Sequence, residues 1–298
     1  MVDVCAIGYV THESEEFHGV YREFTAGPPY FFSITLKRLG TDIMIVTRLN
    51  LEDDYILNEL RDLGIKITVI PSRRTTSFHT TYGKSLDERY LKVISVGDPF
   101  TPNDLNYCCA CRYIYIGPLT TEDFSLEFFK RAYGIAPIIF DVQGFTRKVV
   151  GDKIEYVDWS WKFEGSRYVT IFKADAKEAK LLTGLKDPAK ASEVIASWGP
   201  REVLVTSTEG VYLHVKGVGT FFAPFIVDAV KGRVGRGDTC TGAYVHARLK
   251  GWSFDFAIKF AAAATSLKLQ YPGPLKNSER DVLDYVNQKY SSIEAKLT

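Results

Sequence analysis

Short apolar segments alternate with amphipathic segments along most of the chain. Runs expected to form strands and helices in turn occupy residues 4–8, 31–39, 43–46, 55–63, 67–70, 113–116, about 122–133, 138–140, 168–172, 176–182 and 203–205. This order is typical of a mainly parallel sheet with helices on both faces, whose ligands bind at the carboxyl ends of the strands. The sequence therefore predicts an α/β fold.

Two insertions, at about residues 11–26 and 75–97, interrupt this alternation. The second contains two runs of alternating polar and apolar residues, at 76–82 and 89–94, which predict strands outside the main sheet. A small sheet built from both insertions would cover the strand ends as a lid and exclude water from a reaction. Two hairpins without a function are the alternative. We assign residues 1–298 to a single domain that carries this lid.

The last third of the chain predicts two consecutive helices. The first covers residues 239–250 and ends at Gly251, and Ser253 is placed to cap a second helix over 254–269. Small residues at 261–264 would permit close packing in the core or the approach of a flat ligand.

Composition and charge narrow the classes of partner. The 37 Lys and Arg against 36 Asp and Glu give a net charge of +1, so no basic excess attracts nucleic acid or an anionic membrane. The chain has 46% hydrophobic and 24% charged residues, an ordinary balance for a folded protein. No run reaches the roughly 18 apolar residues of a spanning helix, and no basic region precedes the first apolar run. We therefore expect a cytoplasmic protein with neither a nucleic-acid nor a membrane partner.

Five cysteines are present, and three of them lie close together at Cys108, Cys109 and Cys111. An odd number without a matching second cluster does not indicate a disulfide framework. Three ligands at this spacing also fall short of the four that a structural metal site takes. We expect small buried residues that lead into a strand.

The usual nucleotide-binding motifs are not present. Residues 83–85 mimic the end of a P-loop, but Phe78 stands where the first glycine is required. The first strand runs into Gly8 with no G-x-G-x-x-G after it, which argues against a dinucleotide site of the Rossmann type.

A glycine-rich segment at residues 232–243 runs directly into an amphipathic helix. Gly235 and Gly237 allow successive backbone N–H groups to point into one concavity, and the start of the helix adds the positive end of its dipole. Asp238 stands beside this anion site, where it is suited to accept the proton of a hydroxyl that attacks a phosphoryl group. The spacing alone leaves open that Asp238 is an ordinary N-cap residue.

The run from Gly235 to Thr239, with Gly242 and Ala243 after it, resembles the G-A-G-D-T-F-x-G-A signature of the ribokinase family, the pfkB-type carbohydrate kinases. Segments at 27–40, 116–119, 141–147 and 177–184 resemble other family segments in the expected order. The resemblance thus covers nearly the whole chain. It implies a Rossmann-like three-layer core with a small β lid, in agreement with the pattern above.

The resemblance also implies roles for the residues of the turn. Asp238 becomes the catalytic base, and the N–H groups of Gly235, Arg236 and Gly237 form the anion hole. Arg236 replaces the customary Ala and brings a cation within reach of the phosphates. A solvent-facing arginine is the alternative.

ATP and Mg²⁺ are the cofactors that the resemblance implies. Asp175 and Glu178 occupy the positions of the family's N-x-x-E motif, in which Glu178 would hold Mg²⁺ through water. Residues 206–210 stand at the nucleotide loop. The remaining donor contacts are expected at Thr206, Thr208, Gly210, Ala264 and Lys268.

On the acceptor side, the resemblance places Thr11, Gly27 and Pro28 at the sugar-binding positions, without the Asp and Asn of typical sugar kinases. The amide of Gln143 suits ring hydroxyls, and Arg147 suits a phosphate or a neighbouring carboxylate. A role in capping local structure is an equal alternative for both. The segment 141–147 and the aromatic run after Gly27 are similar to the archaeal and plant myo-inositol kinases.

We therefore expect an ATP-dependent kinase that phosphorylates a hydroxyl of a small carbohydrate or cyclic polyol. One alternative is a nucleoside or vitamin kinase of the same fold, in which Tyr30, Phe31 and Phe32 would stack on a flat base. Another is a homologue that binds a nucleotide or sugar without catalysis. Lid strands often pair between subunits in this family, so the resemblance also implies a homodimer through the lid.

Overall fold

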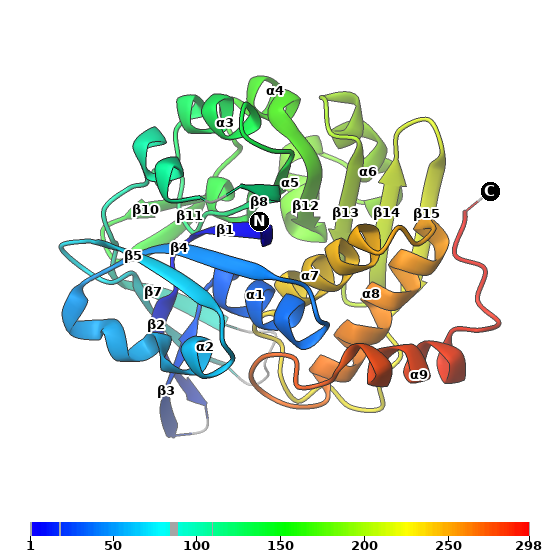
Figure 1. The fold of residues 1–298 in the computed structure, drawn as a ribbon, viewed down its shortest axis with the longest axis horizontal. Coiled ribbons are helices and arrows are strands. Elements are labelled where there is room, and N and C mark those ends of the chain that lie inside the picture. The colour runs from blue at the N-terminus through cyan, green and yellow to red at the C-terminus, as the bar shows by residue number, and fades with distance from the viewer. Residues whose placement is uncertain (1, 18, 84–88, 109, 298) are drawn as a thin grey trace.

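The fold is known from a computed structural model that describes residues 2–17, 19–83, 89–108 and 110–297. Lys84 and Ser85, from the rejected P-loop match, and Cys109 lie outside the described residues. Within the described ranges, nine strands form one large sheet and six strands form a smaller one (Figure 1).

The large sheet is mainly parallel. All neighbouring pairs from β13 to β5 are parallel, and β14 and β15 add an antiparallel edge. The α/β fold predicted from the sequence is thereby confirmed. Across the sheet the strands lie in the order β15 (Gly219–Pro224), β14 (Gly210–Val215), β13 (Glu202–Thr206), β12 (Val169–Asp175), β9 (Ile138–Asp141), β8 (Cys111–Gly117), β1 (Val2–Gly8), β4 (Ile43–Leu49) and β5 (Lys66–Pro71).

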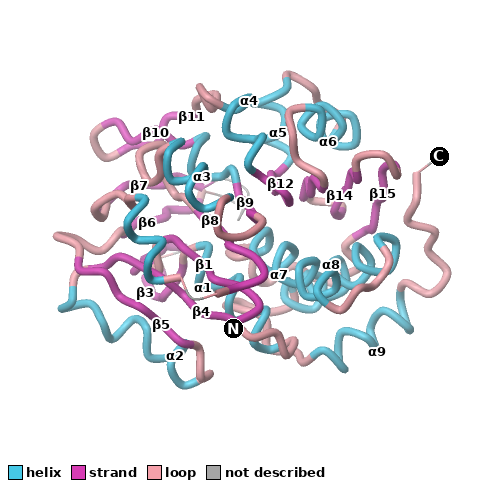
Figure 2. Tube along the Cα trace, turned by 45° about the horizontal axis from the view of Figure 1, so that its top comes forward, coloured by secondary structure: helices cyan, strands magenta, loops and turns pink. Residues whose placement is uncertain are grey.

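Helices cover both faces of this sheet (Figure 2). Strand β1 shows why: Val4 and Ala6 pack into one buried cluster, and Cys5 and Ile7 pack into the other. None of the helices in the described ranges is long and apolar enough to cross a membrane. The first cluster is covered by α1 (Pro28–Arg38), α2 (Asn58–Asp62), α7 (Arg236–Leu249), α8 (Phe254–Leu269) and α9 (Glu279–Lys289), and the second by α3 (Leu126–Tyr133), α4 (Lys162–Gly165), α5 (Ala176–Thr183) and α6 (Pro188–Ser197).

The smaller sheet contains the two segments predicted to form a lid, and we call it the lid. Its strands lie in the order β10 (Arg147–Val150), β11 (Lys153–Tyr156), β7 (Arg89–Ser95), β6 (Ser77–Tyr82), β2 (Thr11–Phe17) and β3 (Val20–Ala26). Phe78 and Val93 bury one of its faces against the second cluster. Strands β2 and β3 fall within residues 11–26, and β6 and β7 within 75–97. The hairpin β10–β11 is a third contribution, which the sequence analysis did not anticipate.

Helix α7 is placed by close contact with α1. A Cβ atom on Gly242 would lie 3.1 Å from the side chain of Thr35, so glycine at this position allows the two helices to approach. The helix begins at Arg236, three residues earlier than predicted, and Asp238 therefore lies in its first turn. Helix α8 begins where predicted, with Ser253 as N-cap accepting a hydrogen bond from the N–H of Phe256 at 3.3 Å.

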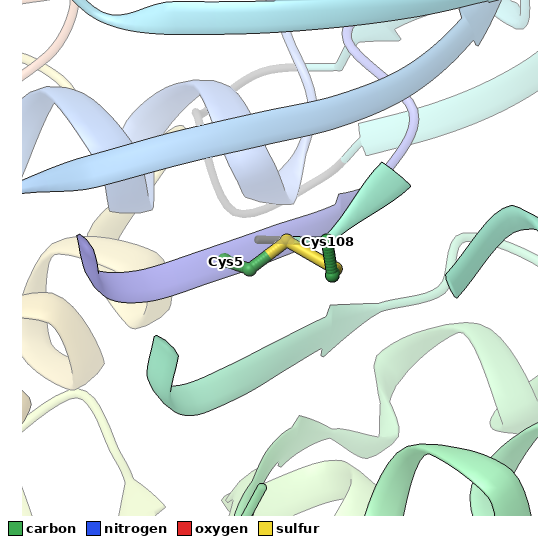
Figure 3. Close-up of a disulfide and its surroundings, with 2 residues drawn as sticks. All are labelled: Cys5 and Cys108. Carbon is green, nitrogen blue, oxygen red and sulfur yellow. A yellow bond between two sulfur atoms is a disulfide. The ribbon is translucent and has the colours of Figure 1, made fainter. Parts of the chain in front are cut away.

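The expectation for the cysteines was wrong in one respect. Cys5 on β1 and Cys108, just before β8, form a disulfide (Figure 3), with Cα atoms 6.0 Å apart and a sequence separation of 103. Cys240 is free and buried, as expected of a small core residue, and Cys111 at the start of β8 is half-buried. Because β1 and β8 are neighbours in the sheet, the cross-link joins two segments that already pair.

Reduction of this disulfide should lower the stability of the fold. We expect the free energy of unfolding to fall by about 2–4 kcal/mol when Cys5 and Cys108 are reduced, because the unfolded chain regains the freedom of a long loop. Urea denaturation with and without reductant measures the change, and Cys108→Ser, which cannot form this disulfide, is the control whose stability the reductant should leave unchanged. Equal midpoints under both conditions would contradict the expectation.

Candidate active site

The glycine turn at the start of α7 forms the floor of the candidate site. Gly235 is the N-cap of α7 and adopts φ +79°, a left-handed conformation that favours glycine. A Cβ atom there would also lie 2.3 Å from the ring of Phe31. The N–H groups of a first helical turn have no acceptor within the helix, and the helix dipole makes this end positive. The turn is therefore suited to bind an anion.

The three amides expected to form the anion hole are not equivalent. The N–H of Arg236 donates to the carbonyl of Arg233 at 3.1 Å, inside the turn itself. Gly237 lies in the first helical turn, so its N–H has no intrahelical acceptor and is available to an anion.

Asp238 lies in the first turn of α7 and is not its N-cap, so the alternative of an ordinary cap is wrong. Its carboxylate is half-buried, and Oδ1 accepts a hydrogen bond from the hydroxyl of Tyr115 at 3.3 Å. The ring of Tyr115 on β8 stacks on Phe32 of α1, with centroids 3.9 Å apart. Burial, followed by the nearby charge of Asp141, raises the pKa of Asp238 to about 7. A carboxylate with this pKa is well matched to proton transfer near neutral pH.

Lys173, which the sequence analysis missed, connects the turn to the carboxylates around it. Its ammonium lies 2.9 Å from Oδ2 of Asp141 on β9 and 4.0 Å from Oε2 of Glu178 on α5, and all three side chains are buried. A Cβ atom on Gly237 would lie 2.7 Å from Nζ of Lys173, so the ammonium packs directly against the turn. Burial opposes its charge, but Asp141 and Glu178 hold the pKa of Lys173 above its usual range. The only sequence signal was a lysine inside the mainly apolar segment 169–174.

Asp175 and Glu178 form a capping box at the start of α5. Asp175 accepts hydrogen bonds from the N–H groups of Lys177 and Glu178, both at 2.8 Å, and Glu178 accepts one from the N–H of Asp175 at 2.7 Å. Burial, followed by the charge of Asp175, raises the pKa of Glu178 to about 8.

These carboxylates do not fit a directly bound metal ion. Glu178 and Asp141 share the ammonium of Lys173, and each also accepts a backbone N–H. No group of three or more His, Cys, Asp or Glu side chains in the described part of the chain is arranged to hold an ion.

The residues expected to contact the nucleotide lie on several elements: Thr206 ends β13 beside Asp175 of β12, Gly210 begins β14, and Ala264 belongs to α8. Thr206, Gly210 and Ala264 are buried, with Ala264 on the face of α8 that packs into the first cluster, and Thr208 is exposed. Loop 206–210 is closed by a hydrogen bond from the N–H of Ser207 to the carbonyl of Gly210 at 2.8 Å.

Lys268, in contrast, lies beside the turn. Its fully buried ammonium donates to the carbonyl of Gly232 at 2.9 Å and ties the end of α8 to the segment before the turn. Burial lowers the pKa of Lys268 to about 8, although the charge of Asp238 opposes this change.

Two of the expected acceptor residues lie near the carboxylates. Gln143 follows β9, and its N–H donates to Oδ1 of Asp141 at 3.0 Å. The charge of Arg147, at the start of β10, lowers the pKa of Glu178 against the larger effect of burial. Within the described residues, Nε of Arg147 is buried and has no hydrogen-bond partner. Such a group is suited to an anionic ligand.

The other expected acceptor residues have mainly structural environments. Thr11 is buried and donates to Oε1 of Glu13 at 3.0 Å. Gly27 has φ +98°, and a Cβ atom there would lie 2.2 Å from the carbonyl oxygen of Tyr9. Pro28 is buried at the start of α1.

A cavity of about 410 Å³ opens between the lid and the core, next to the turn. Its lid wall includes Glu15, which pairs with Arg22 and accepts a hydrogen bond from the hydroxyl of Tyr82 at 2.9 Å. Its core wall includes Tyr30 and Phe31 of α1 and residues 231–234, which lead into the turn. Phe31 contributes to the cavity wall and also packs on Gly235, so the cavity adjoins the anion site.

Comparisons with known proteins agree with this arrangement. The family described as pfkB family carbohydrate kinase matches residues 152–280. A ribokinase of Haemophilus influenzae is 32% identical over 111 residues, which are 35% of this chain and 36% of that protein's length.

Solved structures extend the match to the whole chain. A sulfate complex of a pyrophosphate-dependent kinase in the ribokinase family has a TM-score of 0.88 and 33% identity, over 95% of this chain and 99% of that one. Another structure, of a pyrophosphate-dependent kinase of this family with a pyrophosphate analog and myo-inositol, has a TM-score of 0.86 and 32% identity, over 94% and 99%. An Arabidopsis thaliana ribokinase shares the fold, with a TM-score of 0.77 and 18% identity over 96% and 98%.

The fold and the site thus define a phosphotransferase whose acceptor is a sugar or polyol hydroxyl. The chain belongs to the ribokinase family of pfkB-type carbohydrate kinases, as the resemblance implied.

Replacement of Asp238 by Asn should abolish most of the turnover. The amide cannot take the acceptor proton, so kcat should fall by at least roughly a hundredfold while the fold and donor binding remain. Steady-state kinetics and thermal unfolding measure the two effects, and Asp62→Asn on the exposed side of α2 is the control. Similar turnover in Asp238→Asn would remove this residue from the mechanism.

The activity should also depend on pH through Asp238. Because the base must be deprotonated, kcat/KM should be low below about pH 7 and should rise to a plateau above it. In Tyr115→Phe this acid limb should move to higher pH, since the hydrogen bond that stabilises the carboxylate is lost. The exposed Tyr133→Phe is the control. If the acid limb of Tyr115→Phe stays at the same pH, the hydrogen bond from Tyr115 to Asp238 does not influence the pH dependence of kcat/KM.

Proposed function

We propose that this protein transfers a phosphoryl group from pyrophosphate to a hydroxyl of a cyclic polyol of the inositol class. The observation that carries the proposal is the position of Asp238, a half-buried carboxylate beside the amide of Gly237 and close to the ammonium of Lys173. A proton acceptor next to a site for an anion is what phosphoryl transfer to an alcohol requires.

In the proposed reaction, the acceptor oxygen forms a bond to the terminal phosphorus while the bridging P–O bond of the donor breaks. Asp238 takes the hydroxyl proton, and orthophosphate leaves. The amide of Gly237 and the positive charges near the turn, on Lys173 and Lys268, stabilise the developing negative charge. The lid covers the acceptor and excludes the water that would hydrolyse the donor.

Two observations favour pyrophosphate over the ATP expected from the sequence. Thr206 and Ala264, two of the expected nucleotide contacts, are buried, and Lys268 is bound to Gly232 beside the turn. Pyrophosphate needs contacts for its charge but no pocket for a base. Three solved structures with 31–33% identity over 94–96% of this chain are described as structures of pyrophosphate-dependent kinases or of a variant of one.

The choice of an inositol-like acceptor rests on the cavity and on the same relatives. Tyrosine hydroxyls, the Glu15 carboxylate and aromatic faces line the cavity, and they suit the hydroxyl groups and C–H faces of a polyol ring. One relative is described in complex with myo-inositol, and another is described as a myo-inositol-1 kinase converted into a myo-inositol-3 kinase.

Three further expectations stay predictions. The first is a contact of Glu178 with Mg²⁺ through water, and the steps above assign no role to the ion. A homodimer through the lid follows from the resemblance alone. A cytoplasmic location also stays a prediction. The Cys5–Cys108 disulfide does not favour it, because disulfides are rare in reducing compartments.

A matrix of donors and acceptors tests the proposal. Pyrophosphate and ATP are each offered with myo-inositol, ribose and adenosine, and phosphorylated products are measured by ³¹P NMR and mass spectrometry. We expect inositol monophosphate from pyrophosphate, with kcat/KM at least about tenfold above that with ATP. Asp238→Asn should give no product with the preferred pair, whereas Asp62→Asn should equal the unaltered protein.

Each other result selects an alternative. Preference for ATP with the same acceptor would show that the donor is ATP instead of pyrophosphate, and would leave Asp238 as the catalytic base. Phosphorylation of adenosine alone would indicate the nucleoside kinase. Binding without any product across the matrix would indicate the homologue that lacks catalysis.

A further inference from the structure

The ammonium of Lys173 lies between the carboxylates of Asp141 and Glu178, next to the glycine turn at the start of α7. Its Nζ lies 2.9 Å from Oδ2 of Asp141 and 4.0 Å from Oε2 of Glu178. A divalent ion bridging the same two oxygens would need this volume, because Mg²⁺ binds oxygen at about 2.0–2.1 Å. The ammonium and the ion therefore exclude one another.

Backbone N–H groups also hold both carboxylates in place. Oδ1 of Asp141 accepts the N–H of Gln143 at 3.0 Å, and Oε2 of Glu178 accepts the N–H of Asp175 at 2.7 Å. A metal ion bound through Oδ1 of Asp141 or Oε2 of Glu178 would compete with these backbone bonds as well as with the ammonium. Both hydrogen bonds anchor local structure, at the start of the short helix after β9 and at the start of α5.

The ammonium is also positioned where a cation would serve the reaction. It packs against Gly237, whose amide opens the anion site, and it is one of the charges that act on Asp238. A fixed positive charge here offsets the repulsion between the phosphate and the carboxylates around it.

We propose that Lys173 is a built-in cation that takes the place of a carboxylate-held divalent ion, so that any divalent ion reaches this site only together with the donor. This inference deepens the proposed function, since it concerns the same donor site. Its test measures metal binding rather than turnover, so it can fail while the phosphoryl transfer stands, and the reverse.

Mn²⁺ is the probe, and its binding is followed by electron paramagnetic resonance and by calorimetry. The unaltered protein should bind no Mn²⁺ at this site without pyrophosphate and should bind it when pyrophosphate is added. Lys173→Met keeps the length of the side chain but removes the charge, and it should bind Mn²⁺ without donor at least about tenfold more tightly than the unaltered protein. Adding Glu178→Gln to Lys173→Met should remove that gain. Lys180→Met, on the exposed side of α5, should behave as the unaltered protein.

Two results would overturn the inference. The first is binding of one Mn²⁺ by the unaltered, donor-free protein that is lost in Glu178→Gln, a measurement that does not depend on the folding of Lys173→Met. The second is a folded Lys173→Met, checked by circular dichroism, that gains no Mn²⁺ binding.

Discussion

The buried charge of Lys173 constrains the arrangement of the whole site. An ammonium removed from water is costly unless opposite charges and hydrogen bonds surround it. Asp141 and Glu178 provide those charges, and backbone N–H groups hold both carboxylates in place. Strands β9 and β12, helix α5 and the first turn of α7 therefore have one favourable relative position. Removing any one partner would leave a buried charge uncompensated.

The fold delivers these groups to one place because neighbouring parallel strands end on the same side of the sheet. Asp141 ends β9, Lys173 lies near the end of β12, and Tyr115 lies near the end of β8. Helix α7 approaches from the other layer and adds Asp238. The close packing of Gly242 on α1 sets the distance between the two helices. This small residue therefore helps to determine where the first turn of α7 lies relative to the strands.

Features encoded by local signals could be predicted from the sequence. The glycine turn before Asp238 and the Ser253 cap are both determined by a few adjacent residues. The parallel sheet could also be predicted, because each strand and helix shows its own pattern of apolar residues within a short segment. The exact start of α7 was missed, because Gly235 as an N-cap gives no side-chain signal.

Features that depend on distant residues could not be predicted. The pairing of Cys5 with Cys108 joins positions 103 residues apart, and nothing near either one indicates it. Lys173 belongs to an apolar strand, and its carboxylate partners come from other elements. Burial of Ala264 depends on how α8 packs, which the composition of the helix does not determine.

Arg147 belongs to two parts of the molecule at once. It is the first residue of β10, at the edge of the lid sheet, and its guanidinium acts on Glu178 beside the donor turn. A ligand bound by this side chain would therefore contact the small sheet and the site of Asp238 through one residue, whose carbonyl also accepts the N–H of Thr121 in the loop after β8 at 3.1 Å.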